Sequence, residues 1–183
     1  MYHKNSQKRI YLKNAIYFVT TRTYQNHNIF SNSNNCEILM RIMHNASGQM
    51  NVDIFGFVII PNYVHILLQP RRNTISKVMS IIKGRSARII NLINTYSSTT
   101  GASASSGAPH LNCERKHSLA GCGGIKHTWH KSFHDHIIRG DNDFRLHIEY
   151  LRINPIKHGL VKEGEAYPYL CINKKLVHKL FDK

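Results

Sequence analysis

The sequence predicts a domain of mixed α/β (α+β) class, because both extended and helical segments occur along it. Residues 15–23 (AIYFVTTRT) alternate and are rich in β-branched and aromatic types, which is typical of a strand. Residues 52–60 (VDIFGFVII) and 63–70 (YVHILLQP) are two further strand-like apolar runs. Pro61-Asn62 breaks the chain between them, so the two runs together predict a hairpin.

Two helices are predicted beside these strands. Residues 32–47 carry apolar residues near helical spacing, after Ser and Asn residues that can cap a helix. A second helical pattern begins at Thr74 and continues on both sides of the basic segment KGRSAR, residues 83–88. This segment places three cations on or beside the helix, available to phosphate: Lys83, Arg85 and Arg88.

A third helix is predicted near residues 142–153, with Asp141 as its N-cap. We expect it to end at Asn154, since the residue before a proline disfavours the α region. Its core face is formed by residues at i, i+4 and i+7, namely Phe144, Ile148 and Leu151. The final segment, YPYLCINKKLVHKLF, predicts an edge strand and a short terminal helix.

Residues 97–125 divide the domain in two. They begin with the low-complexity run SSTTGASASSGAP and continue as a polar, Gly-rich stretch, which predicts a flexible insertion. Residues 1–96 and 126–183 are then the two parts of a single domain.

The charge balance predicts a polyanionic partner. Lys and Arg number 25 against 10 Asp and Glu, which gives a formal charge of +15. Nucleic acid is the favoured polyanion, and a solvated basic surface remains the alternative. The chain contains no apolar run of membrane-spanning length, and its 4 cysteines are widely scattered, so a cytoplasmic, reduced protein is expected.

Two His-rich segments carry weaker signals. The residues His110, Cys113, His117 and Cys122 have ligand types suited to zinc, but their spacing matches no familiar module. They leave open an unrelated basic binding protein with a zinc-stapled loop. His134-Asp135-His136 is interpreted as a local polar or DNA-facing feature without a catalytic role.

Two groups of residues are candidates for chemistry. Tyr63 and His65 are two apart in a predicted strand and therefore share a face. In the third helix, Tyr150 and Asn154 lie one turn apart, and His147 precedes Tyr150 by three residues. This polar face is rotated away from the core face of the same helix.

Several motifs in order resemble those of single-tyrosine HUH transposases, in particular the REP-associated tyrosine transposases and the transposases of simple insertion sequences. The segments are YFVTTR at 17–22, PNYVH at 61–65, WHKSFHDHIIR at 129–139 and YLRINPIKHG at 150–159. The resemblance implies a ferredoxin-like α/β sandwich, with an antiparallel central sheet that carries the histidines and a helix that presents the tyrosine to them.

The resemblance also implies an activity: cutting and rejoining single-stranded DNA near hairpins through a 5′-phosphotyrosine intermediate. Tyr150 would be the nucleophile, His65 the second HUH histidine and Asn154 a further metal ligand. A Mg²⁺ or Mn²⁺ ion would polarise the phosphate, because a phenol is weakly nucleophilic at neutral pH. Further phosphate contacts are expected from Arg139, Arg152 and Lys157. Either a monomer or a homodimer is compatible with the family.

Tyr63 departs from the family pattern, since it stands where the motif has its first histidine. Three interpretations are open: the protein binds DNA but cuts it poorly, another residue such as His147 replaces the lost ligand, or Tyr63 has a new role, including that of an alternative nucleophile. Impaired cleavage is the favoured hypothesis. The competing function is a non-catalytic nucleic-acid-binding module on the same fold.

Overall fold

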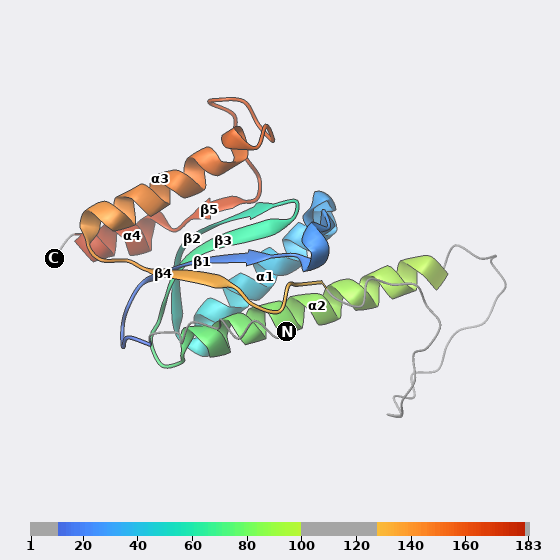
Figure 1. Ribbon diagram of the computed structural model, residues 1–183, viewed down its shortest axis with the longest axis horizontal. Coiled ribbons are helices and arrows are strands. Elements are labelled where there is room, and N and C mark those ends of the chain that lie inside the picture. The colour runs from blue at the N-terminus through green and yellow to red at the C-terminus, as the bar shows by residue number, and fades with distance from the viewer. Residues whose placement is uncertain (1–10, 100–127, 182–183) are drawn as a thin grey trace, which may run out of the picture.

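The computed structural model describes residues 11–99 and 128–181, in which a five-stranded antiparallel sheet has helices on both faces (Figure 1). Helices α1 and α2 cover one face, and α3 and α4 cover the other. The elements are β1 (Tyr17–Arg22), α1 (Ser33–Met50), β2 (Val52–Ile60), β3 (Tyr63–Pro70), α2 (Ile75–Thr99), β4 (His134–Ile137), α3 (Asp141–Lys157), β5 (Leu170–Ile172) and α4 (Lys174–Phe181). Two short 3-10 turns, Tyr24–Asn26 and Ile29–Ser31, connect β1 to α1.

The strand order β4-β1-β3-β2-β5 confirms the predicted fold class. The succession β1-α1-β2-β3-α2-β4 is the ferredoxin-like pattern, and β5 adds an edge strand beside β2. The predicted hairpin is present, since β2 pairs antiparallel with β3. β3 is therefore the central strand, with neighbours on both sides.

Alternation along β3 sorts its side chains between two hydrophobic cores. Val64, Ile66 and Leu68 belong to the core beneath α1 and α2, whereas Leu67 belongs to the core beneath α3. Tyr63 also packs in the α3 core, and the ring of His65 lies against Phe18 of that core. The prediction that Tyr63 and His65 share a face is confirmed.

Helix α1 agrees with its predicted start and runs slightly past its predicted end. Asn32 is the N-cap, and its side chain accepts a hydrogen bond of 2.9 Å from the Asn34 N–H. The helix ends at Met50, where Asn51 adopts a left-handed conformation with φ of 54°.

Helix α3 differs from its prediction at both ends. Its N-cap is Gly140, with φ of 151°, and Asp141 and Asp143 fall inside the first turn, where carboxylates interact favourably with the helix dipole. The helix continues through Pro155 to Lys157. Asn154 and Pro155 are buried, so packing against the sheet compensates for the hydrogen bond that the proline ring removes.

Gly56 in β2 allows α3 and β5 to approach the sheet closely. A Cβ atom at this position would lie 3.0 Å from the Cys171 carbonyl oxygen and 3.1 Å from Leu151 Cδ1. The ladder between β2 and β3 also shifts register between Ile54 and Gly56. Glycine at position 56 therefore helps to set the distance between α3 and the sheet.

Two further differences concern β4 and the insertion. His134–Ile137 forms an edge strand that pairs with β1, whereas its His-Asp-His was predicted only as a local polar or DNA-facing feature. α2 extends to Thr99, so residues 97–99 are helical although they were predicted as linker. The remainder of that segment, including the His110–Cys122 group, lies outside the described residues. No helix in the described ranges is long and apolar enough to cross a membrane.

Candidate functional site

Helix α3 lies across the central strand and brings the two predicted residue groups together. The ring centroids of His65 and Tyr150 are 5.2 Å apart, and those of Tyr63 and His65 are 4.9 Å apart. Asn154 is fully buried on the α3 side of this group, and His65 is only 5% exposed. Four residues from β3 and α3 thus meet at one place between the sheet and the helix.

The hydroxyl of Tyr63 joins this group through two hydrogen bonds. It donates to Asn154 Oδ1 at 3.0 Å and lies 2.5 Å from His158 Nε2. Since a hydroxyl has one proton, the His158 ring nitrogen is the donor in the second bond. The Asn154 side-chain NH₂ is buried and has no partner among the described residues. The Tyr63 hydroxyl is therefore hydrogen-bonded to the Asn154 amide oxygen, which the family resemblance assigns as a metal ligand.

Tyr63 is a neutral phenol in this setting. Burial raises its pKa, as does the neighbouring Tyr150, and the bond to Asn154 and the nearby Arg22 offset this only in part. A neutral phenol is a weak ligand for a hard divalent cation, which prefers carboxylate and carbonyl oxygens.

His65 is held as a neutral imidazole. Its Nδ1 is 2.8 Å from the Thr20 hydroxyl, and the β1–β3 register places these two residues opposite each other. Phe18 stacks on the imidazole at 5.1 Å with an interplanar angle of 23°. Burial lowers the pKa of His65 to about 4, and the positive charges of His158, Arg22 and His147 act in the same direction. The bond to Thr20 leaves Nε2 as the nitrogen available for another partner.

A cleft of about 470 Å³ opens beside Tyr150. Two exposed apolar side chains flank the tyrosine along α3, since Leu146 is 69% exposed and Ile153 is 43% exposed. The lining residues are Phe18, Thr20, His65, Leu146, His147, Glu149, Tyr150 and Ile153. The cleft therefore combines a phenol, a neutral imidazole and an apolar rim.

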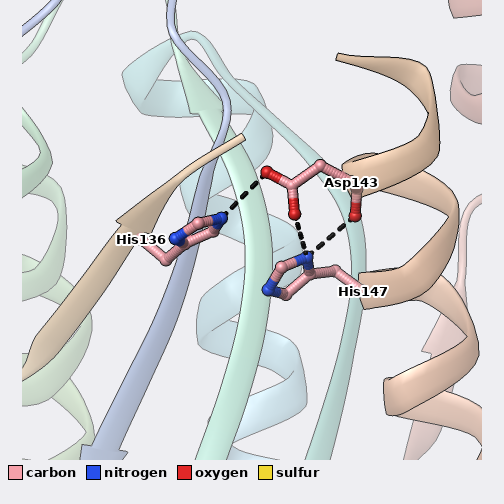
Figure 2. Close-up of side chains that lie close together, drawn as sticks. All are labelled: His136, Asp143 and His147. Atoms are coloured by element: carbon pink, nitrogen blue, oxygen red, sulfur yellow. Dashed lines mark hydrogen bonds and ion pairs between the residues drawn. The ribbon is translucent and has the colours of Figure 1, made fainter. Parts of the chain in front are cut away.

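A second polar cluster lies where β4 meets the first turn of α3 (Figure 2). The Asp143 carboxylate is 2.9 Å from His136 Nε2 through one oxygen and 3.0 Å from His147 Nδ1 through the other, and His147 Nδ1 is also 2.8 Å from the Asp143 backbone carbonyl. The two imidazole rings stack at 4.8 Å with an interplanar angle of 19°. Burial alone would raise the pKa of Asp143, but the Arg139 N–H, the His136 hydrogen bond and the two imidazoles lower it overall.

Phe18 separates the two clusters. On the sheet it lies opposite His136 of β4 on one side and Leu67 of β3 on the other. Its ring contacts His147 at 4.5 Å as well as His65. His147 consequently lines the Tyr150 cleft and also belongs to the second cluster. His65 lines the same cleft but does not belong to the second cluster.

The predicted phosphate contacts are not gathered around Tyr150. Lys83 Nζ donates to the His130 carbonyl at 2.7 Å, and Arg85 donates to Gln49 on the opposite side of the sheet from α3. Arg152 lines a different cleft, of about 900 Å³, between α3 and α4. Arg88 is exposed on α2, Arg139 in the turn before α3, and Lys157 in the last turn of α3.

Sequence reasoning missed several members of both clusters. His158 lies inside the quoted motif YLRINPIKHG, so its proximity to Asn154 could have been predicted from the sequence. Its contact with Tyr63 depends on how α3 crosses β3. Thr20 and Phe18 required the register of β1 against β3. His136 and Asp143 required β4, which the sequence analysis did not predict.

Comparison with known proteins identifies the family. The model of a family described as "Transposase IS200 like" matches residues 11–102, which is half of the chain. The matched range includes β1, the β2–β3 hairpin and both Tyr63 and His65. The chain belongs to the IS200-like transposase family.

Two individual proteins extend this result. The REP-associated tyrosine transposase of Escherichia coli (strain K12) is 36% identical over 58 residues, which is 32% of this chain and 35% of that protein. The aligned segment thus spans about a third of that relative. The solved structure of a REP-associated tyrosine transposase bound to a REP hairpin superposes with a TM-score of 0.64 at 19% identity, covering 96% of this chain and 87% of that one. This superposition establishes that the IS200-like chain shares the fold.

Proposed function

We propose that this IS200-like transposase acts on single-stranded DNA beside hairpins, with Tyr150 as its nucleophile, and that Tyr63 keeps its cleavage activity low. The observation that carries the proposal is the placement of Tyr150 opposite the neutral imidazole of His65, with Tyr63 bonded to Asn154 beside them. Family membership supports transposition chemistry. The charge of +15 and the hairpin bound by a protein of the same fold support DNA as the partner.

The proposed reaction is a transesterification. The Tyr150 hydroxyl oxygen bonds to a backbone phosphorus, and the bond from phosphorus to the 3′ oxygen breaks. The 5′ phosphate remains on Tyr150, and the leaving oxygen takes a proton to become a 3′-hydroxyl. The phenolic proton of Tyr150 leaves to solvent, because the neighbouring His65 is unprotonated but has a pKa of only about 4 and is therefore a weak base. Attack by a 3′-hydroxyl on the phosphotyrosine reverses these changes and rejoins the strand.

The residues at the family's metal position do not fit a Mg²⁺ or Mn²⁺ ion. His65 and Asn154 are the two remaining ligand types, but the Asn154 oxygen accepts the Tyr63 hydrogen bond and the third group is a neutral phenol. Within residues 11–99 and 128–181 no carboxylate groups with His65, although Glu149 lines the same cleft and hard cations favour carboxylate oxygens. We therefore propose that His65 and Asn154 could serve as metal ligands only if Tyr63 were replaced. We propose no step through a metal in the natural chain.

Four forms of the full chain test the proposal: the natural protein, Tyr63→His, Tyr63→His with Tyr150→Phe, and Tyr63→Phe. Each is incubated with labelled single-stranded hairpin DNA and Mn²⁺, and covalent adducts are separated on a denaturing gel. Tyr63→Phe is the matched control, because it removes the hydroxyl that engages Asn154 without supplying an imidazole. We expect a strong Mn²⁺-dependent adduct from Tyr63→His, little from the natural chain and Tyr63→Phe, and none from the double variant.

Other results lead to different functions. A strong adduct from the natural chain would contradict the inhibitory role of Tyr63, and an adduct from the double variant would exclude Tyr150 as the nucleophile. Tight hairpin binding without an adduct in any form would favour the second candidate, a non-catalytic DNA-binding module. That candidate is favoured by the Tyr63–Asn154 bond itself, which engages the Asn154 oxygen without a cation.

A further inference from the structure

We propose that His136, Asp143 and His147 form a binding site for one divalent transition-metal ion of the zinc class. The three side chains come from two elements, with His136 on β4 and the other two on α3 (Figure 2). Asp143 and His147 are four residues apart, so they project from the same face of the helix. Two imidazoles and one carboxylate are a donor set that proteins use for zinc, with a further position left to water or another ligand.

The spacing of the donor atoms suits such an ion after a small adjustment. Bond lengths of 2.0–2.2 Å place the ligand atoms of one ion about 3.0–3.6 Å apart. The carboxylate oxygens are already 2.9 Å and 3.0 Å from the two ring nitrogens, and all three ligand atoms lie within 4.8 Å of one another. His147 Nδ1 is also 2.8 Å from the Asp143 backbone carbonyl, and an ion bound through this nitrogen would replace that hydrogen bond. His136 is the most exposed of the three, with a side chain that is 45% accessible, so its ring is free to make the adjustment.

Neighbouring groups hold two of the three ligands in place. The Arg139 N–H donates to Asp143 Oδ2 at 2.9 Å, which fixes the carboxylate over the start of α3. Phe18 packs against the His147 ring at 4.5 Å. Such outer contacts orient ligands and strengthen metal binding.

The chemistry of the donors selects the kind of ion. Imidazole nitrogen suits zinc and similar transition metals, whereas Mg²⁺ prefers an octahedral shell of oxygen atoms. The site is also distinct from the family position at His65, since Phe18 lies between the two. An ion here would join the edge strand β4 to α3 one turn before Tyr150, and would therefore position the helix that carries the tyrosine.

Isothermal titration of the full chain with ZnCl₂, in the presence of Mg²⁺ and without DNA, tests the site. All forms carry Cys113→Ser and Cys122→Ser, which remove the thiols of the His110–Cys122 segment as zinc ligands. Asp143→Asn retains an oxygen to accept the Arg139 N–H, and His136→Gln changes an exposed side chain, so both are expected to fold. His134→Gln on the same strand and His65→Gln in the other cluster are the matched controls.

We expect one zinc ion per chain, unaffected by Mg²⁺. Asp143→Asn and His136→Gln should each weaken the affinity at least about tenfold, while the two controls stay within about twofold. Co²⁺ should give a visible absorption band that disappears in the same two variants. Absence of zinc uptake, uptake unchanged in both ligand variants, or loss of uptake in His65→Gln would overturn the proposal. Because the readout involves no DNA, it is independent of the cleavage experiment.

Discussion

Two polar clusters lie on the α3 face of the sheet, and they differ in what they leave available. In the Tyr63 cluster, Asn154 is fully buried and its oxygen already accepts a hydrogen bond from a neutral phenol. In the His136 cluster, the side chains are 21% to 45% exposed and include an ionised carboxylate. Both contain imidazoles close to other ligand types, so proximity alone does not distinguish them. The difference is that the His136 cluster contains an anionic oxygen donor, whereas the Tyr63 cluster offers a cation only neutral groups.

The comparison also indicates what a single residue does at position 63. A histidine there would offer a ring nitrogen toward Asn154 and His65, and the first cluster would become a donor set. The Tyr63 hydroxyl instead forms hydrogen bonds with Asn154 and His158, so the Asn154 oxygen already has a partner. The same face of the sheet thus holds one cluster of neutral groups, in which the Asn154 oxygen is already hydrogen-bonded, and one cluster that includes a carboxylate.

The largest expected effect concerns the protonation of His65. Its folded pKa of about 4 lies below the ordinary value of 6.5, so between these pH values the unfolded chain binds a proton that the folded chain does not. Stability therefore rises with pH across this window and levels off above it. Relative to His65→Gln, the natural chain should lose about 3 kcal/mol more of its unfolding free energy between pH 7 and pH 4. Urea unfolding at several pH values measures this.

The charged groups that face His65 are His158, Arg22 and His147, and all three remain in the variant. Asp143, whose stabilising effect is lost at more acidic pH, is also common to both chains and cancels in the difference. His134→Gln, an exposed substitution on β4, should follow the natural chain. Equal pH dependence in the natural chain and His65→Gln would mean that His65 is not held neutral by its surroundings.

The second effect tests the open cluster through stability. An ion that binds only the folded chain should stabilise it by about 2.7 kcal/mol at a free concentration one hundred times its dissociation constant. We therefore expect ZnCl₂ to raise the thermal midpoint of the form lacking Cys113 and Cys122. The rise should be about half as large or smaller in the same form with Asp143→Asn, because a tenfold weaker site contributes only about 1.4 kcal/mol at that concentration. An equal rise in both would place the stabilising ion elsewhere.

Much of the fold followed from local sequence patterns. The apolar runs of β2 and β3 are buried on both faces of a central sheet, so their length and the Pro61-Asn62 break were sufficient to predict the hairpin. The end of α3 was predicted wrongly because burial of Asn154 and Pro155 outweighs the local cost of a proline. β4 was missed because an exposed four-residue edge strand has little hydrophobic pattern.

The residues of the site could be predicted only where a sequence motif or helical spacing identified them. Tyr63, His65, Tyr150 and Asn154 meet as the two motifs implied, because strand alternation and helix periodicity fix which face each one takes. The partner of the Tyr63 hydroxyl depended on how α3 crosses β3, which no local pattern encodes. The His136 cluster depended equally on the pairing of β4 with β1.

The smallest effect isolates the hydroxyl of Tyr63. Tyr63→Phe would leave the buried Asn154 oxygen without its donor, which should cost about 1–2 kcal/mol of unfolding free energy. Tyr11→Phe is the matched control: its hydroxyl bonds Ser76 at 2.8 Å, but the residue is 52% exposed and water can replace the bond. Tyr63→His should fall between the two, since an imidazole N–H can again donate to Asn154. If urea unfolding gives the same small loss for Tyr63→Phe and Tyr11→Phe, the hydrogen bond from Tyr63 to Asn154 does not stabilise the first cluster. The two clusters would then differ only in the chemical type of their ligands.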